Sequence, residues 1–251
     1  MQIPADLKGK TALITGTNRG IGKALLEAFC LAGCSVISLS RQKEEAHLEL
    51  LKELSVKHQV EIFPYYADLS DEAALKQTLR DICSAHKKID ILINNAGTAF
   101  GASALMTPIS TLKDLFSVNF YAPVQIMQTI SRLMLRAGSG SIINIASVGG
   151  IECRPGYLAY GSSKCALIYA SRCLALELGQ NGVRVNAIAP GLIDTSMGHY
   201  KNSDELALTV SRTALRKMGS VNDVVSAALY LASDSAAFVT GEVLRVDGGR
   251  Y

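Results

Sequence analysis

Short apolar runs alternate with longer amphipathic segments along the chain. The short runs have the length of strands, and we predict strands at residues 11–15, 35–39, 60–67, 89–97, 141–147, 182–191 and 242–249. The segments between them follow a helical period, and we predict helices at residues 20–32, 42–58, 71–86, 112–136, 157–180 and 222–232, with polar helical sequence at 194–217. Strands that are apolar on both faces and alternate with helices indicate a parallel sheet covered on both sides. The pattern therefore predicts an α/β fold, a Rossmann-type doubly wound parallel sheet of about seven strands with helices on both faces.

The composition predicts a single folded domain. Hydrophobic residues make up 49% of the 251 residues and charged residues 19%, a balance that excludes an intrinsically disordered chain. No repeat, low-complexity tract or linker divides the sequence, so we expect one domain over residues 1–251.

Charge and cysteine usage restrict the partners that the chain is expected to have. The net charge is +3 without any charge run, which argues against nucleic acid or an anionic membrane as the main partner. Residues 91–112 carry no charge, but Asn94, Gly101 and Pro108 interrupt them, which indicates a strand and a loop rather than a membrane span. The six cysteines form no Cys-x-x-Cys pair and the four histidines have no zinc-site spacing. We therefore expect no metal, no disulfide framework and a cytoplasmic protein with buried thiols.

A glycine-rich turn follows the first predicted strand. In Thr-Gly-Thr-Asn-Arg-Gly-Ile-Gly at 15–22, Gly16 permits a tight exit from the strand, Gly20 allows close approach of a pyrophosphate, and Gly22 allows close packing of the next helix. The N-terminus of that helix offers unpaired N–H groups and a positive dipole end to an anion. Strand, turn and helix in this order predict a dinucleotide site.

The end of the second predicted strand favours NADP(H) over NAD. An NAD site usually has Asp or Glu here, whereas this chain has Ser38, Leu39, Ser40 and Arg41. Arg41 can pair with a 2′-phosphate and Ser40 can donate to it, while Arg19 can stack on adenine or add a second cation. The alternative is that Arg41 is a solvated residue that opens the next helix.

A tyrosine and a lysine share one face of the helix predicted at 157–180. Tyr160 and Lys164 are four residues apart, so they lie one turn from each other. A phenol has an ordinary pKa of about 10, and a nearby ammonium lowers that pKa toward the range useful for proton transfer. Ser147 lies at the exit of the fifth strand, where its hydroxyl can donate to a substrate carbonyl. Asn119 lies inside a long predicted helix, a position that indicates a local distortion or a bound water. Tyr-x-x-x-Lys alone is a common surface pair, but the combination favours catalysis.

These residues together resemble the short-chain dehydrogenase/reductase family, in its branch of about 250 residues. The resemblance extends over nearly the whole chain and rests on 15–22, Asp68, Asn-Asn-Ala-Gly at 94–97, Asn119, Ser147, Tyr160, Lys164, Pro190, Gly191 and Thr195. It implies that Tyr160 is the general acid in ketone reduction and that Ser147 orients the carbonyl. It also implies that Lys164 holds the nicotinamide ribose, and that Asn119 holds a water of a proton relay.

The resemblance implies the remaining contacts to the cofactor. Asp68 and Leu69 would flank the adenine, and Asn95, Ala96 and Gly97 would line the path along ribose and nicotinamide. Residues at the sixth strand's exit would fix the nicotinamide. The full predicted set is Gly16, Asn18, Arg19, Gly20, Ile21, Gly22, Ser40, Arg41, Asp68, Leu69, Asn95, Ala96, Gly97, Tyr160, Lys164, Pro190, Gly191, Ile193 and Thr195. Members of the family usually form homotetramers.

Within the family, the motifs are most similar to 3-oxoacyl-(acyl-carrier-protein) reductases. The likeness predicts an NADPH-dependent carbonyl reductase whose substrate is a 3-oxoacyl thioester, with an acyl carrier protein as a possible partner. Asn181 stands where such reductases commonly carry a basic docking residue, and Arg132, Arg136 or Arg172 would have to substitute. The alternatives are a free small ketone or alcohol, a polyketide, a sugar or a steroid as substrate. A nucleotide-sensing protein without catalysis is a third hypothesis.

Residues 192–217 are predicted to form a lid over the substrate. They follow the carboxyl end of a strand, where ligands bind in open α/β sheets. Met197 and Tyr200 would face the substrate, and His199 is expected to be a solvated lid residue. Phe100, Ile151 and Tyr157 would complete an apolar wall. Arg154 would either pair with a substrate carboxylate or phosphate or form a structural salt bridge.

Overall fold

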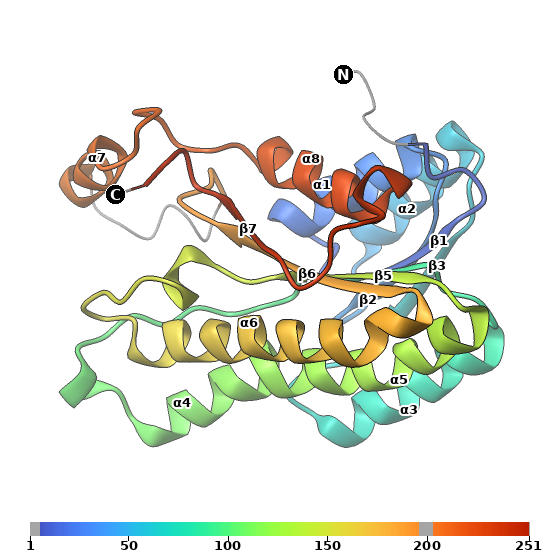
Figure 1. The fold of residues 1–251 in the computed structure, drawn as a ribbon, viewed down its shortest axis with the longest axis horizontal. Helices are drawn as coiled ribbons and strands as arrows, with labels where there is room; N and C mark the ends of the chain where they lie inside the picture. The colour runs from blue at the N-terminus through green and yellow to red at the C-terminus, as the bar shows by residue number, and fades with distance from the viewer. Residues whose placement is uncertain (1–5, 196–202, 251) are drawn as a thin grey trace.

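One parallel sheet of seven strands organises the molecule (Figure 1). The computed structural model describes residues 6–195 and 203–250. The strand order is β3-β2-β1-β4-β5-β6-β7, and every neighbouring pair is parallel. The strands are β1 (Thr11–Thr15), β2 (Ser35–Ser40), β3 (Ile62–Tyr66), β4 (Ile91–Asn94), β5 (Gly140–Ile145), β6 (Val183–Pro190) and β7 (Val243–Val246). The predicted doubly wound α/β domain is thus confirmed.

Helices cover both faces of the sheet. The described helices are α1 (Gly20–Leu31), α2 (Glu45–His58), α3 (Glu72–Ala85), α4 (Ile109–Phe116), α5 (Ala122–Ala137), α6 (Leu158–Leu178), α7 (Ser203–Ser211) and α8 (Val221–Ala232). In Figure 1, α1, α2 and α8 lie above the sheet, and α3, α5 and α6 lie below it. One apolar core lies on each face: the first includes Phe29 of α1 and Val224 of α8, and the second includes Leu79 of α3 and Ile130 of α5.

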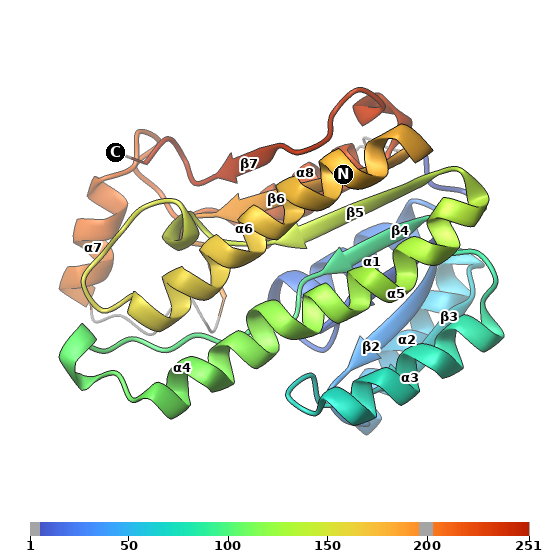
Figure 2. The same cartoon turned by 60° about the horizontal axis from the view of Figure 1, so that its bottom comes forward.

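The long helix predicted at 112–136 is interrupted where Asn119 lies. The segment begins as α4, widens into a π-helical turn at Ser117–Tyr121, and continues as α5 to Ala137. Such π turns occur as single insertions and are frequent at functional sites. The predicted distortion at Asn119 is confirmed, and Figure 2 shows α4 and α5 as one continuous rod beside α6.

The polar segment at 194–217 is less helical than its composition indicated. Within its described part, the α-helix is limited to α7. The chain that follows α7 pairs instead with the C-terminal segment through an antiparallel bridge between Thr213 and Arg250. Ala214 and Leu215 donate backbone hydrogen bonds to Gly249 and Gly248. Long-range backbone pairing therefore replaces local helix formation there.

The winding of the sheet reverses between β1 and β4. Ligands of open α/β sheets bind at such a point, outside the carboxyl ends of the strands.

The expectation of buried thiols is met only in part. Cys30 and Cys34 are buried, whereas Cys153 on a loop and Cys165 on α6 are exposed. Among the described residues, no helix combines the length and apolar composition needed to cross a bilayer.

Candidate active site

The glycine turn between β1 and α1 is shaped by close backbone contacts. A Cβ on Gly22 would lie 1.9 Å from the Gly16 carbonyl oxygen, and one on Gly16 would lie 3.0 Å from Ala96 Cα. Gly16 and Gly20 also have φ values of +73° and +55°, which favour glycine. The turn therefore leaves the N-terminus of α1 open at the end of the sheet, as a pyrophosphate site requires.

Thr15 and Asn95 fasten this turn to the end of β4. The Thr15 hydroxyl accepts hydrogen bonds from the backbone N–H groups of Asn95 (3.0 Å) and Ala96 (2.9 Å). The Asn95 side-chain amide donates to the carbonyl oxygens of Thr15 (2.9 Å) and Gly16 (3.2 Å). Asn95 is thus placed at the predicted site, and Thr15 is an addition that the sequence analysis missed.

Arg41 and Asp68 lie at the end of the site expected to hold adenosine. Arg41 is exposed after β2. The Asp68 carboxylate accepts hydrogen bonds from the Ser70 hydroxyl (2.7 Å) and backbone N–H (2.9 Å). These two bonds lower the pKa of Asp68, and the positive charge of Arg41 lowers it further. The charge of Arg41 therefore acts on Asp68 at this end of the site.

Ser40 differs from its predicted role as a phosphate donor. Its side chain is only 2% exposed, and its hydroxyl lies 3.1 Å from that of Thr17. Thr17 also lies 2.6 Å from the Ser38 hydroxyl and 3.2 Å from His47 Nε2. Burial lowers the pKa of His47, so the cluster is held by neutral hydrogen bonds. The alternating polar positions Ser38 and Ser40 in an apolar strand were the available signal for it.

Lys164 is buried beneath the carboxyl end of β5. Its side chain is part of α6 and donates a hydrogen bond from Nζ to the Ile145 carbonyl oxygen at 2.8 Å. Burial lowers the pKa of Lys164 to about 8. A Cβ on Gly97 would lie 3.3 Å from Lys164 Nζ and 3.2 Å from Asn119 Oδ1. A side chain at position 97 would therefore have to displace these two polar groups by a few tenths of an ångström.

Ser147 and Tyr160 meet on the substrate side of the same region. The Ser147 oxygen accepts a hydrogen bond from the Gly149 backbone N–H at 3.0 Å, which leaves the hydroxyl proton available for donation. Ser147 and Tyr160 share a side-chain hydrogen bond, which lowers the pKa of Tyr160. The structure therefore brings Ser147, after β5, and Tyr160, on α6, into contact.

The pKa of Tyr160 differs from the expectation that Lys164 would lower it. Burial, the largest effect, raises the pKa of the phenol above its ordinary value, and the neighbouring Tyr157 raises it further. An ammonium favours the charged form of a phenol, but the loss of water around a partly buried phenol disfavours that form and is the larger effect here. In the protein without cofactor, Tyr160 is consequently a protonated phenol at neutral pH.

Asn119 connects the π turn to both sides of the site. Its amide nitrogen donates to the Thr98 carbonyl oxygen (2.9 Å) and to the Ser163 hydroxyl (3.0 Å). Its amide oxygen accepts from the Thr98 backbone N–H at 2.9 Å. Ser163 in turn donates to the Tyr160 carbonyl oxygen at 2.7 Å. Asn119 therefore positions the loop after β4 against the helix that carries Tyr160.

The exit of β6 faces the glycine turn. Gly191, directly after Pro190, donates its backbone N–H to the Val246 carbonyl oxygen at 2.9 Å. Thr195 approaches the turn so closely that a Cβ on Gly20 would lie 3.6 Å from its methyl group. Ile193 pairs with Gly219 through a parallel bridge. Met197, His199 and Tyr200 of the predicted lid lie outside the described residues.

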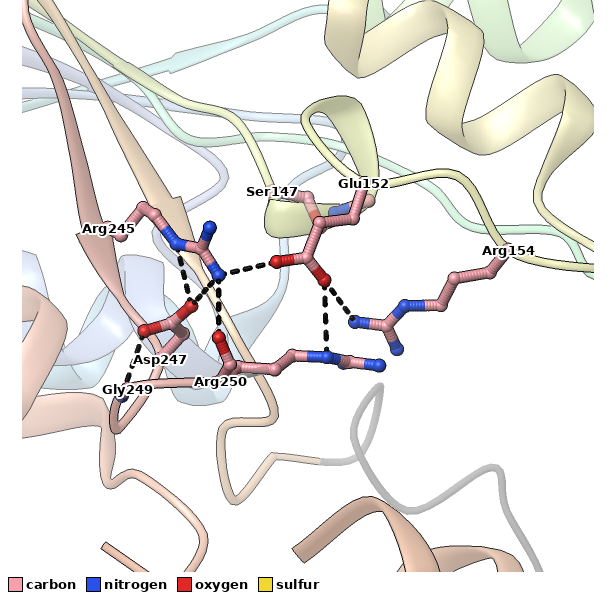
Figure 3. A network of polar contacts seen from close by, with 8 residues as sticks. Ser147, Glu152, Arg154, Arg245, Asp247, Gly249 and Arg250 are labelled. Atoms are coloured by element: carbon pink, nitrogen blue, oxygen red, sulfur yellow. Dashed lines mark hydrogen bonds and ion pairs between the residues drawn. The ribbon is translucent and has the colours of Figure 1, made fainter. Parts of the chain in front are cut away.

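An arginine-rich network borders the site beyond Ser147 (Figure 3). The Glu152 carboxylate forms ion pairs with the guanidinium groups of Arg245 (2.5 Å) and Arg250 (3.3 Å). Nη2 of Arg154 lies 3.8 Å from the same carboxylate. Asp247 pairs with Arg245 at 2.5 Å. Arg154 could be singled out from the sequence, but its neighbours could not, because Glu152 and Arg245 are 93 residues apart. No cluster of three metal-ligating side chains occurs within 6–195 or the described side chains after 205.

A family model and known proteins match this chain over nearly its whole length. The family model described as "Enoyl-(Acyl carrier protein) reductase" matches residues 16–250. The 3-oxoacyl-(acyl-carrier-protein) reductase FabG of Thermotoga maritima is 33% identical over 243 residues, 97% of this chain and 98% of the relative. D-erythrulose reductase of Gallus gallus is 35% identical over 252 residues, 99% and 98% of the two chains.

A solved structure shows the same fold. The NADPH-dependent 3-quinuclidinone reductase of Rhodotorula rubra superposes with a TM-score of 0.89 at 31% identity, covering 97% of this chain and 92% of that chain. Together with the parallel sheet and the arrangement of Ser147, Tyr160 and Lys164, these matches place the chain in the short-chain dehydrogenase/reductase family of oxidoreductases.

Proposed function

We propose that the protein reduces a ketone to a secondary alcohol with NADPH and that Tyr160 is the general acid. The observation that carries the proposal is the joint placement of Ser147, Tyr160 and buried Lys164 at one end of the sheet, beside the glycine turn. A structural role alone does not require a buried ammonium group next to a partly buried phenol, because both groups lose hydration there.

The site fits a nicotinamide dinucleotide. Its glycine cradle excludes a Cβ at Gly22, and the open N-terminus of α1 suits a pyrophosphate. When bound, the cofactor supplies a hydride to the carbonyl carbon. Lys164 would hold the ribose hydroxyl groups, and the exit of β6 at Gly191 and Thr195 would orient the nicotinamide.

The chain's own residues manage the carbonyl oxygen and its proton. The Ser147 hydroxyl would donate its proton to the carbonyl oxygen and orient it, while one lone pair of the hydroxyl accepts from the Gly149 N–H. The Tyr160 phenol transfers its proton to that oxygen as negative charge develops there. Asn119, Lys164 and Tyr160 would then restore the proton from solvent. Asn119 is held beside the helix that carries Tyr160 by its bond to Ser163, which in turn donates to the Tyr160 backbone carbonyl oxygen.

We expect Arg41→Asp to reverse the preference between NADPH and NADH. An aspartate repels a 2′-phosphate and accepts from a 2′-hydroxyl, whereas Arg41 pairs with the phosphate. The loss of a charged hydrogen-bonded pair should lower kcat/KM for NADPH by about 100-fold, with NADH raised or unchanged. Steady-state kinetics with both cofactors measure this. The exposed Arg80 of α3 provides the control Arg80→Asp, and an unchanged preference in Arg41→Asp would contradict the role of Arg41.

The substrate class is tested by a panel of carbonyl compounds. The likeness to FabG favours a 3-oxoacyl thioester, and the likeness to D-erythrulose reductase favours a free small ketone. We expect NADPH oxidation with acetoacetyl thioesters or with free ketones such as dihydroxyacetone, and the higher kcat/KM identifies the class. NADPH binding without turnover on the whole panel would instead favour a nucleotide-sensing protein.

Further parts of the proposal concern assembly and the lid. We propose a homotetramer in the cytoplasm, and a substrate lid that comprises residues 192–217. An acyl carrier protein is proposed as a partner only if thioesters are the better substrates. Size-exclusion chromatography with light scattering tests the tetramer.

A further inference from the structure

The arginine-rich network at the edge of the site contains more cations than anions. Three guanidinium groups, those of Arg154, Arg245 and Arg250, gather around the carboxylates of Glu152 and Asp247 (Figure 3). The two carboxylates leave one positive charge uncompensated within the network. Such a charge close to a reaction centre attracts anionic ligands.

The uncompensated charge falls on Arg154. Glu152 is occupied by Arg245 on one oxygen (2.5 Å) and by Arg250 on the other (3.3 Å). Arg154 Nη2 lies 3.8 Å from Glu152, which is too long for a hydrogen bond. Asp247 is already paired with Arg245. Arg154 therefore has the weakest contact of the three arginines.

Arg154 is also deprived of water. Its side chain is 16% exposed, and its Nε and Nη2 atoms are buried with no hydrogen-bond acceptor within the described part of the chain. These two nitrogens share one edge of the guanidinium plane, the edge that can pair with both oxygens of a carboxylate or phosphate. A buried charged donor without an acceptor is costly, so this edge favours a ligand that supplies oxygen atoms.

Arg154 is connected to the catalytic side chains by aromatic contacts. Its guanidinium carbon lies 5.4 Å from the centre of the Tyr157 ring, and that ring lies edge-on to Tyr160 with 5.8 Å between centroids. A Cβ on Gly149 would lie 2.9 Å from the Tyr157 ring and 3.4 Å from the Ser147 hydroxyl. One aromatic ring therefore separates Arg154 from the groups that bind the carbonyl oxygen.

We propose that Arg154 binds an anionic oxygen group, a carboxylate or a phosphate, carried by the ketone substrate. This inference rests on the proposed ketone reduction, and it favours short keto acids or keto phosphates over acyl thioesters. Because one ring separates the two sites, the anion must lie within a few bonds of the ketone. The Tyr157 ring positions the guanidinium through its face.

The test compares anionic ketones with neutral partners of nearly the same shape. The carboxylate arm uses pyruvate, acetoacetate, 4-oxopentanoate and 5-oxohexanoate, each with its methyl ester. The phosphate arm uses dihydroxyacetone phosphate and dihydroxyacetone. We expect wild-type kcat/KM to favour the anion by at least about tenfold in one arm, the size of one charge-assisted contact. The arm that shows the preference identifies the anion.

Two variants with opposite expected effects separate substrate binding from a structural role. Arg154→Gln should lower kcat/KM for the anionic ketone about 10–100-fold and change the neutral partner less than about threefold. Glu152→Gln removes the competing carboxylate and should increase the preference for the anion. Arg80→Gln, on the far helix α3, should change neither. The thermal midpoint of each variant reports its folding.

Several outcomes would overturn the inference. Equal losses on anionic and neutral ketones in Arg154→Gln, with a lower thermal midpoint, would identify a structural ion pair. A wild-type enzyme that reduces the neutral partners as well as the anions would refute the subsite while ketone reduction stands. Absence of turnover on all ketones would refute the proposed function instead. In that case, calorimetric titration of the same acids and esters into the NADP⁺-saturated protein decides whether the anion subsite exists.

Discussion

Replacing Tyr160 with phenylalanine is expected to lower kcat for ketone reduction about 10²–10⁴-fold, the usual contribution of a general acid. The substitution removes only the hydroxyl, so the edge-on contact with Tyr157 is kept. Binding of NADPH should stay within about threefold of wild type, because the glycine turn and Lys164 are unchanged. Stopped-flow turnover and fluorescence titration of NADPH measure the two quantities.

The matched control for this substitution is Tyr169→Phe. Tyr169 lies on the same helix, α6, but is 71% exposed, so its hydroxyl should contribute nothing to turnover. Reduction by Tyr160→Phe at the wild-type rate would refute the assignment of the general acid.

The pH dependence follows from the direction of the phenol's shift. Burial raises the pKa of Tyr160, so the proton that reduction needs is retained through neutral pH and is lost only on the alkaline side. We therefore expect kcat for reduction to fall at alkaline pH and oxidation of the alcohol to rise there. Tyr160→Phe should lose this alkaline limb, which a merely structural tyrosine would not produce.

Replacing Gly22 with alanine is expected to weaken NADPH binding by about 10–100-fold and to destabilise the protein by about 1–3 kcal/mol, as overpacked sites do. The new methyl group would lie 1.9 Å from the Gly16 carbonyl oxygen and 2.5 Å from the Asn95 side-chain nitrogen. Either the turn or α1 must move, and both define the pyrophosphate site. Thermal unfolding and NADPH titration measure the two effects.

Gly179→Ala is the matched control for backbone freedom. Gly179 has helical dihedral angles, φ −59° and ψ −40°, and a Cβ there would meet no atom within 4 Å. Alanine should be neutral or stabilising by about 0.5–1 kcal/mol at such a position. If Gly22→Ala behaved like this control, close packing at the glycine turn would not be the reason for glycine there.

Local spacing explains why much of the fold and site could be predicted from the sequence. A helix places residues four apart on one face whatever surrounds it, so Tyr160 and Lys164 could be paired in advance. The start of the helix predicted at 71–86 is likewise fixed by a local contact, because the Asp71 carboxylate accepts from the Ala74 N–H at 2.9 Å. Asn119 inside a long predicted helix indicated a local distortion or a bound water, and the structure has a π turn there.

Interactions between segments that are distant in the sequence could not be predicted in this way. Ser40 was expected to face a phosphate, but Thr17 and His47 from other elements enclose it. The polar character of 194–217 indicated helix, yet part of that segment pairs with the C-terminal chain. Neither outcome depends on local periodicity, because each depends on which segment packs against which.

The sequence by itself determined the alternation of strands and helices, the glycine turn and the set of candidate catalytic residues, because periodicity and backbone freedom act over a few neighbouring residues. Only the tertiary structure decided the protonation of Tyr160, the burial of Lys164 and the grouping of Glu152 with arginines from the C-terminal segment. Desolvation and charge pairing depend on all the groups that meet at one point in space, and the fold brings such groups together from distant positions, as Glu152 and Arg245 show at a separation of 93 residues.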